Sequence, residues 1–399
     1  MVDGDRSQGA EVLKPEFPLS HTPLKELLLD TLRRTGPMTF ERYMALCLYH
    51  PEFGYYTQGR ERTGVAGDYF TSSDLHPVFA RLVARQAAEM WDAMGRPRPF
   101  TWVEMGAGRG VFASDFLPWS TGALPELAAA LDYVAIEPGS QQRQRIETRL
   151  AGMGVRAKVR MLAHLEELAP ATGCFFSNEL VDAFPVSVVT RSGGHLKEIY
   201  VTAQGDDLRE KPGPISDPAV AAYVARYAPQ LEEGHRVEVN RQAQAWIHAV
   251  ARKLTRGFVL TIDYGDRANR LFTLDRPRGT LLAYHGHTAA EDFFTMPGET
   301  DLTAHVNFSA LIDAGKAGGL EFAGFTTQEK FLLALGEANQ FADVYDPGQT
   351  ELEMLQARLR LKRLISPEGM GNIFKVLLQH RGVSKTELTG WKFERAAAS

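Results

Sequence analysis

Residues 102–112 read "WVEMGAGRGVF", and a short apolar strand runs into Glu104 before the glycines begin. The glycines stand at alternate positions, Gly106, Gly108 and Gly110. Glycine has no Cβ atom, so this backbone is open to unusual angles and to the close approach of a ligand. A strand, a glycine-rich turn and a helix in succession are typical of an open parallel sheet, whose ligands lie beyond the carboxyl ends of the strands.

The chain on both sides of this stretch has the rhythm of an α/β protein. "LDYVAIE" (131–137) predicts a second strand, and a helix is expected to begin at Ser140. "GCFFSN" (173–178) and "GFVLTIDYG" (257–265) read as further buried strands. Strands that alternate with helices predict βαβ units and a parallel sheet with helices on both faces.

The rhythm breaks after Pro185, where "VSVVTRSGGHLKEIYVT" (186–202) predicts a β-hairpin that turns at residues 192–194. We therefore divide the chain into four parts. They are residues 1–73 with N-terminal helices and a lid over the ligand site, 74–185 and 236–399 with the two parts of the core, and 186–235 with an inserted hairpin that forms a smaller cover domain.

Composition and charge restrict the class of protein. A chain of 399 residues suffices for two domains or one elaborated core. The formal net charge of -5 gives no electrostatic reason to expect a nucleic acid or an anionic membrane as partner.

Cys47 and Cys174 stand far apart in apolar surroundings, so we expect buried free thiols and neither a disulfide framework nor a metal site. A polar N-terminus and no apolar run of about 20 residues predict a cytoplasmic protein, and we allow for a homodimer.

Three ligands compete for the glycine turn. A nucleoside triphosphate site would need Lys and Ser or Thr where Val111 and Phe112 stand, and a dinucleotide site prefers Gly or Ala in place of Val111. S-Adenosylmethionine has no phosphate but carries a cationic sulfonium and an ammonium group, which Glu104 complements in charge. Glu137, at the end of the next strand, can accept hydrogen bonds from both hydroxyls of a ribose. The alternative is that both acids only end their strands in solvent. Together they favour S-adenosylmethionine, bound by Glu104, Gly106, Gly108 and Glu137.

The end of the chain supports this choice. Methyltransferases with this type of sheet finish with an antiparallel hairpin, for which "LEFAGFTT" (320–327) and "NIFKVLLQH" (372–380) are correctly placed. The expected fold is therefore α/β, with the Rossmann-like sheet of class I methyltransferases, a terminal antiparallel hairpin and an added cover domain.

Six blocks of sequence make the prediction more specific. In chain order, between about residues 23 and 315, they read "LKELLLDTLRRTGPMTFERYMALCLYHPEFGYYTQ", "GDYFTSSDLHPVFARLVARQ", "VEMGAGRG", "SNELVDAFPV", "FVLTIDYG" and "PGETDLTAHVNFSAL". With these blocks the chain resembles the MidA-like methyltransferases, which include a mitochondrial complex I assembly factor with protein-arginine methyltransferase activity. The resemblance implies a class I methyltransferase fold with a cover domain and S-adenosylmethionine as methyl donor. For the mitochondrial member it implies symmetric dimethylation of an arginine on a complex I subunit.

Departures from the family bear mainly on the acceptor. Ala107 replaces the usual proline of the glycine turn, "AGDYF" (66–70) replaces Gly-Gly-Asp-Phe, and Phe184 replaces a leucine. These changes leave the polar groups intact, so the implied cofactor is unchanged while the identity of the acceptor is open.

The segment "NELVD" (178–182) follows the predicted fourth strand and should face the transferred methyl group. An acceptor arginine arrives protonated, because its pKa exceeds about 12, and carboxylates are its natural partners. We therefore predict Glu179 and Asp182 as catalytic residues and Asn178 as a cofactor ligand. The alternative is that Asp182 or Asn178 merely caps the turn.

A hydroxyl or phenol acceptor would instead need a general base, most often histidine. His305, four residues after Asp301, is the candidate. Asp263 and Tyr264, at the end of "TIDYG", are placed to line the acceptor pocket.

The segment "AGDYFTSS" (66–73) reads as a lid. In this interpretation Asp68 and Thr71 bind the amino-acid end of the cofactor. The alternative is a packed surface loop.

The sequence thus predicts an S-adenosylmethionine-dependent methyltransferase, with a protein arginine as first choice of acceptor by resemblance alone. A small-molecule O- or N-methyltransferase would have a closed apolar pocket instead. An assembly chaperone that has lost turnover would have a damaged glycine turn, whereas "EMGAGRG" is intact.

Overall fold

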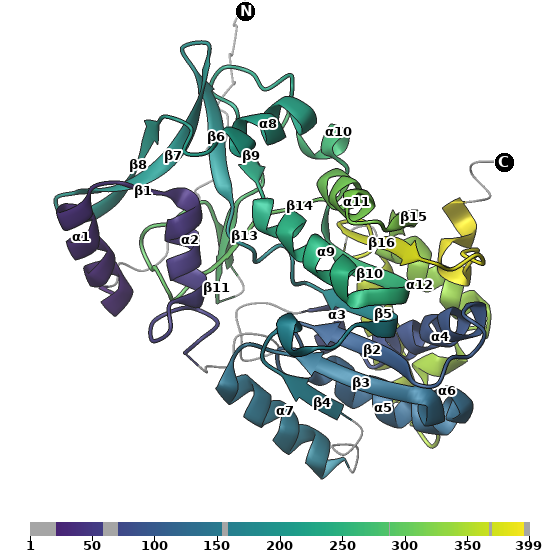
Figure 1. Cartoon of the computed structure of the whole chain (residues 1–399). Coiled ribbons are helices and arrows are strands. Elements are labelled where there is room, and N and C mark those ends of the chain that lie inside the picture. Colours follow the sequence, from purple (N-terminus) through teal and green to yellow (C-terminus); the bar gives the residue numbers. More distant parts are fainter. Residues whose placement is uncertain (1–20, 59–70, 154–158, 287, 367–368, 395–399) are drawn as a thin grey trace, which may run out of the picture.

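The computed structural model describes residues 21–58, 71–153, 159–286, 288–366 and 369–394. Its main sheet has eight strands in the described part of the chain (Figure 1). They are β2 (Phe100–Met105), β3 (Leu131–Ile136), β4 (Val159–Leu162), β5 (Ala171–Asn178), β10 (Leu254–Asp266), β14 (Val306–Asn307), β15 (Glu321–Thr327) and β16 (Phe374–Arg381).

The strand order of the main sheet is β15-β16-β10-β5-β2-β3-β4, and β14 adds to β10. The pairs from β10 to β4 are parallel, which confirms the predicted α/β sheet. β16 lies antiparallel to both β10 and β15, as predicted for the end of the chain. No tight turn joins β15 to β16, because α12 (Gln328–Glu337) and α13 (Glu351–Ile365) lie between them.

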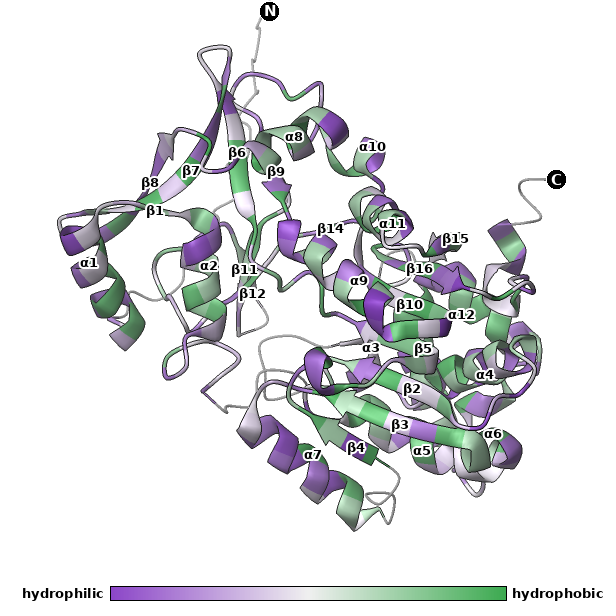
Figure 2. Ribbon diagram, in the orientation of Figure 1, coloured by the Kyte–Doolittle hydropathy of each residue, from purple (hydrophilic) through white to green (hydrophobic). Residues whose placement is uncertain are grey.

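Helices cover both faces of the main sheet. Successive strand residues point to opposite faces, so each strand contributes side chains to both cores. Trp102 and Phe176 belong to a core with α4 (Val78–Ala93) and α5 (Val111–Ala123). Val103 and Phe175 belong to the opposite core, with α9 (Arg241–Lys253) and α11 (Phe308–Ala317). The first face also carries α6 (Pro125–Ala130) and α7 (Ser140–Gly152); α7 is mostly hydrophilic in Figure 2 and buries only Ile146 and Leu150.

A five-stranded antiparallel sheet forms the cover, beside the main sheet in Figure 1. Its strands are β1 (Met38–Thr39), β6 (Ser187–Ser192), β7 (His195–Gln204), β8 (Asp207–Gly213) and β9 (Arg236–Val239), with α1 (Pro23–Thr35) and α2 (Phe40–Tyr49) packed on it. The β6–β7 hairpin turns between Ser192 and His195, as predicted. β1 and β9 come from outside residues 186–235, so the cover sheet includes more of the chain than the predicted insertion. The four-part division of the chain stays a prediction.

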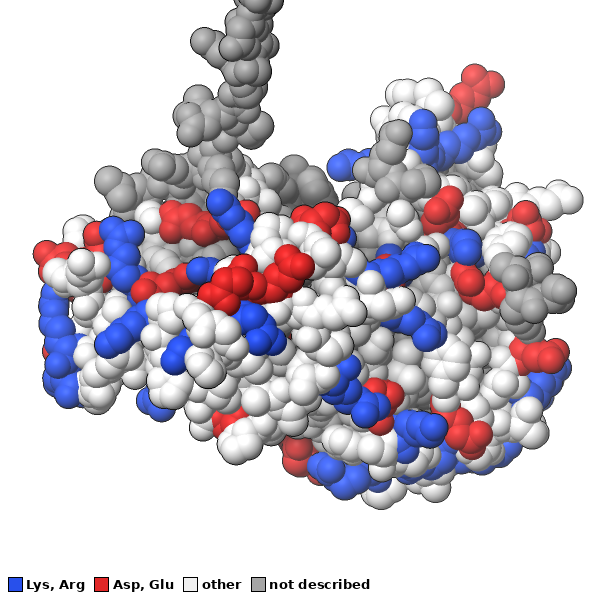
Figure 3. Space-filling model, turned by 90° about the horizontal axis from the view of Figure 1, so that it is seen from above, with Lys and Arg blue, Asp and Glu red and all other residues white. Residues whose placement is uncertain are grey.

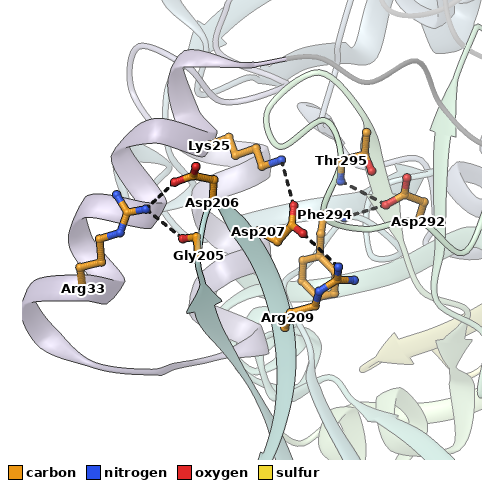
Figure 4. A network of polar contacts seen from close by, with 9 residues as sticks. All are labelled: Lys25, Arg33, Gly205, Asp206, Asp207, Arg209, Asp292, Phe294 and Thr295. Carbon is orange, nitrogen blue, oxygen red and sulfur yellow. Dashed lines mark hydrogen bonds and ion pairs between the residues drawn. The ribbon is translucent and has the colours of Figure 1, made fainter.

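Polar contacts fix α1 to the turn between β7 and β8 (Figure 4). The Arg33 guanidinium donates to the Gly205 carbonyl at 2.9 Å and to the Asp206 carboxylate at 2.8 Å. Lys25 lies 4.0 Å from the Asp207 carboxylate. These contacts join the first described helix to a hairpin about 170 residues later in the chain.

A small sheet connects the cover to the core. It contains β11 (Leu282–His285), β12 (Thr288–Ala290) and β13 (Asp301–Thr303), and β13 leads directly into β14 of the main sheet. The carboxyl ends of the parallel strands therefore face the cover in Figure 1, and the candidate site lies between the two parts. Basic and acidic side chains are interspersed over the face shown in Figure 3. No helix in the described ranges combines the length and apolar character needed to cross a membrane.

Candidate active site

The glycine turn after β2 has left-handed backbone at all three glycines, with φ of +72° at Gly106, +53° at Gly108 and +69° at Gly110. A Cβ atom at Gly108 would meet nothing closer than the Gly106 carbonyl at 3.9 Å, so this part of the turn borders open space. A Cβ atom at Gly110 would lie 2.9 Å from the Ile146 side chain. Gly108 thus leaves room for a ligand, whereas Gly110 allows α7 to pack closely.

Glu137 follows β3 and binds the glycine turn. One carboxylate oxygen accepts from the Gly108 N–H at 3.0 Å, and the other accepts from the Gly139 N–H at 3.0 Å. Burial raises the pKa of Glu137, while these two N–H groups oppose the increase. The carboxylate is therefore held at the mouth of the turn, where the sequence predicts a ribose.

Glu104 is buried below the same turn. Its carboxylate accepts a 2.6 Å hydrogen bond from the Tyr133 hydroxyl. Burial and the nearby Glu137 together raise the pKa of Glu104 to about 8, against the opposing effect of the Tyr133 hydrogen bond. A cationic ligand beside it would favour the ionised form.

The turn after β5 contains residues 178–182, and Asp263 of β10 holds it. One Asp263 carboxylate oxygen accepts from the N–H groups of Leu180 at 3.2 Å and Val181 at 2.9 Å. Glu179 has left-handed backbone, with φ of +54°. The sequence interpretation considered Asn178 or Asp182 as the cap of this turn. In the structure, Asp263 accepts from the N–H groups of this turn instead.

The Glu179 carboxylate connects this turn to α3 (Ser72–Leu75). It accepts from the Ser72 N–H at 2.8 Å and from the Asn178 side chain at 2.9 Å. Burial raises the pKa of Glu179 to about 8. The Asn178 side-chain oxygen is buried and has no hydrogen-bond partner among the residues that the structure describes. An orphaned acceptor of this kind fits the ammonium group of S-adenosylmethionine.

Asp182 lies beside Glu179 with only 5% of its surface exposed. The Tyr264 hydroxyl donates to one of its oxygens. The other oxygen is buried and unpartnered within the described ranges. Burial raises the pKa of Asp182 to about 6.

His305 is close to this group but contacts it through an aromatic ring. Its imidazole packs edge-on against the Tyr264 ring, with 5.4 Å between centroids. Burial, together with the positive charges of Arg276 and Lys375, lowers the pKa of His305 to about 4. His305 is therefore neutral at physiological pH. Asp301, the acid that precedes it, accepts from the Tyr56 hydroxyl at 2.8 and 2.9 Å.

Two tyrosines of the site were missed in the sequence. The Tyr49 hydroxyl donates to the Ala183 carbonyl at 2.9 Å, and its ring stacks on Tyr56 at 5.6 Å. Tyr49 is 41% exposed and reaches the turn after β5 from the end of α2 through this hydroxyl. The signal in the sequence was the aromatic run "FGYYT" and the tyrosine before it.

The predicted lid is described only in part. Asp68 lies outside the described residues. Thr71 is the N-cap of α3, and its side chain is engaged with Asp74 in a reciprocal capping box. Asp74 also forms an ion pair with Arg109 of the glycine turn. The start of α3 is thus fixed against the turn, and the cofactor contacts of Asp68 and Thr71 stay predictions.

The residues at the glycine turn fit S-adenosylmethionine. Gly108 borders open space, Glu104 is a buried acid whose ionised form a cationic ligand would favour, and Glu137 offers a fixed carboxylate. A dinucleotide phosphate would meet two acids at the same place, which argues against it.

Comparison with known proteins agrees with this geometry. Residues 82–326 match the family described as "Putative S-adenosyl-L-methionine-dependent methyltransferase". The human mitochondrial protein arginine methyltransferase NDUFAF7 is 27% identical, over 94% of this chain and 87% of that protein. Its Drosophila melanogaster homologue is 26% identical, over 92% of this chain and 87% of that protein.

A solved structure is similar over almost the whole chain. It is a Burkholderia thailandensis protein bound to S-adenosyl-homocysteine, and it superposes with a TM-score of 0.84 at 31% identity. The match covers 92% of this chain and 94% of that one. The chain belongs to this family of S-adenosyl-L-methionine-dependent methyltransferases and takes its methyl group from S-adenosylmethionine.

Proposed function

We propose that the methyl acceptor is an arginine side chain of a protein. The observation that carries this proposal is the pair of carboxyl groups in the turn after β5, where Glu179 is half-buried and Asp182 is buried. The relatives named as protein arginine methyltransferases support the same acceptor.

The acidic side chains suit a guanidinium in charge and in geometry. A guanidinium is planar, always charged in proteins, and donates several hydrogen bonds in a fixed fork. The unpartnered oxygen of Asp182 is a buried acceptor for one of these N–H groups. The Tyr264 hydroxyl donates to Asp182, so this ring lies next to the carboxylate, and aromatic faces stabilise a nearby guanidinium.

Glu104, Glu137, Asn178 and the backbone of the glycine turn would hold the cofactor. When bound, S-adenosylmethionine supplies the methyl group as a sulfonium with a neutral leaving group. The chain itself orients the acceptor and excludes water, and positioning of this kind supplies up to roughly 10 kcal/mol of the barrier reduction.

Glu179 is assigned the proton transfer. Methylation forms a bond from carbon to a guanidinium nitrogen, which then loses one proton. The Glu179 carboxylate takes this proton, and its raised pKa of about 8 makes it a better acceptor than an exposed glutamate. His305 is not assigned as the base, because its pKa of about 4 makes it a poor acceptor. It supports the Tyr264 ring instead.

A labelled-methyl assay tests the acceptor. The wild-type chain is incubated with methyl-labelled S-adenosylmethionine and cell extract, and the protein fraction is hydrolysed and analysed for methylated arginine. We expect label in methylarginine with the wild type and with Glu321→Gln, a control at an exposed glutamate on β15. We expect a loss of about a hundredfold or more with Glu179→Gln. Label found only in small metabolites would contradict the arginine proposal. A cytoplasmic location and a homodimer stay predictions.

A further inference from the structure

Two adjoining cavities lie beside the candidate active site. One has a volume of about 950 Å³ and is lined in part by His305, Thr280 and Phe294. The other has a volume of about 880 Å³ and lies among residues of α8 (Pro218–Tyr227), α10 (Ala268–Leu271) and α11. Both cavities share Arg276 in their linings, so they meet at this residue.

The linings of these cavities are rich in arginine: Arg209, Arg226, Arg236, Arg267, Arg276 and Arg278. Four of them have acidic partners, in the pairs Arg209–Asp207, Arg226–Asp313, Arg236–Glu210 and Arg278–Glu291. Arg267 packs over the rings of Phe322 and Phe325, at 5.4 and 5.1 Å from their centroids.

Arg276 is exposed, and its guanidinium has no hydrogen-bond or ion-pair partner within the described part of the chain. Further positive charge lies near it. Burial lowers the pKa of Lys375, and the charges of Arg270 and Arg276 lower it further. Lys375 pairs with Asp266 at 3.6 Å, and Asp275 lies close enough to Arg276 for the charge of this arginine to help lower the pKa of the carboxyl group.

The cavity that His305 lines adjoins the acidic side chains of the proposed acceptor site. His305 lines the cavity, and its ring contacts the Tyr264 ring at 5.4 Å. The hydroxyl of Tyr264 donates to Asp182 on the acidic side. Negative and positive regions are thus separated by two aromatic rings.

We propose that the two cavities that meet at Arg276 bind acidic residues that flank the methylated arginine in the acceptor protein. This proposal rests on the proposed function, because it takes the acidic side chains at Asp182 as the place of the arginine. A peptide with an arginine next to glutamate or aspartate matches both regions, since its cation faces Asp182 and its carboxylates face Arg276. The cavity volumes are large enough for such side chains.

Two arginine peptides that differ only in their flanks test the proposal. One has glutamates and the other has glutamines beside the arginine. The proteins are the wild type, Arg276→Glu and Arg252→Glu, which makes the same charge change at an exposed position of α9 outside both cavities. We measure kcat and KM for methyl transfer, and binding of the fluorescently labelled peptides by anisotropy.

With the wild type and Arg252→Glu, we expect KM for the glutamate peptide to be about three- to tenfold lower at similar kcat. With Arg276→Glu this preference should vanish or reverse. Equal KM values for both peptides with the wild type would overturn the proposal while leaving arginine methylation intact.

The anisotropy measurement separates this proposal from the proposed function. If neither peptide is methylated but the glutamate peptide binds and Arg276→Glu abolishes the binding, the arginine assignment fails and the acidic-segment site stands. If binding shows no difference between the peptides, the site fails as well. Displacement of the glutamate peptide by a single-stranded oligonucleotide more strongly than by polyglutamate at equal charge would assign the cavity to nucleic acid and overturn the proposal.

Discussion

Glu104, a proposed cofactor ligand, is placed where it would serve binding at the expense of stability. The carboxyl group is buried, and its pKa is raised to about 8. The folded protein therefore holds a proton there that the unfolded chain releases near its ordinary pKa of about 4.5. Stability from this group falls as pH rises from about 4.5 to about 8, unless a cation binds beside it.

Replacement of this carboxyl group should separate the two effects. At pH 8 without cofactor, Glu104→Gln is expected to be more stable than the wild type by on the order of 1 kcal/mol. The difference should shrink towards pH 4.5, and S-adenosylmethionine binding should weaken by about tenfold or more. Urea unfolding at several pH values and calorimetric titration measure both. Unchanged cofactor affinity would contradict the role of Glu104.

The acidic acceptor side chains predict a pH dependence of catalysis. Arginine stays protonated, so its binding requires ionised Asp182 and Glu179, whose pKa values are about 6 and about 8. We expect kcat/KM to rise with pH across this window and to level off above it. Glu179→Gln should remove the upper part of the rise and leave the lower part. A profile that is flat between pH 5 and 9 for the wild type would contradict the assignment.

At the residue scale, the sequence indicated most of the charged site but not how it is supported. Glu104 and Glu137 lie at the ends of predicted strands and Glu179 follows one, so their places could be inferred from the strands alone. Asp263 caps the turn after β5 from a different strand, 82 residues later than Val181, and only the pairing of β5 with β10 reveals this. The side chain of Tyr49 reaches the site through the packing of the cover, which no local pattern encodes.

At the scale of elements, the strand predictions were best where a strand was buried and apolar. β2, β3, β5 and β10 were found for this reason. The strand β8, "DLREKPG", was missed because it is polar and contains proline, and its pairing with β7 in the cover sheet determines its conformation. The two strands of the predicted terminal hairpin pair antiparallel, but the helices between them, α12 and α13, were not predicted.

The glycine turn allows a comparison with an internal control. Gly108→Ala and Gly110→Ala both place alanine at positive φ, so the backbone cost of about 1–2 kcal/mol is shared. Only Gly110→Ala adds a contact with Ile146, which should cost about 1–3 kcal/mol more in the free energy of unfolding. Gly108→Ala should instead weaken S-adenosylmethionine binding. Chemical denaturation and calorimetry distinguish the two, and equal loss of stability in both variants would contradict this division.

At the scale of the whole molecule, the cover is built from distant parts of the chain. Tyr43 of α2 donates to the Phe293 carbonyl at 2.5 Å, and Thr22 donates to the Pro297 carbonyl at 2.8 Å. With the α1 contacts of Figure 4, these bonds join the start of the described chain to its centre. The N-terminal helices are therefore an integral part of the cover.

Two neighbouring leucines of α1 test how much this packing contributes. Leu28 is 1% exposed in the core of the cover, whereas Leu27 is 40% exposed. Leu28→Ala is expected to lower the free energy of unfolding by about 2–5 kcal/mol, and Leu27→Ala by less than about 1 kcal/mol. Urea unfolding of both variants measures the difference. Similar values for the two would show that α1 contributes little through this face.

The carboxylate of Glu137, held by the N–H groups of Gly108 and Gly139, has a consequence for how the cofactor is received. Each carboxylate oxygen has a second lone pair, so it can accept a ribose hydroxyl without releasing the backbone. The side chain has already given up its rotamer freedom during folding, and binding need not repeat that entropic loss. Pre-organisation of this kind favours rapid, reversible exchange of donor for spent product over a slow rearrangement at each turnover.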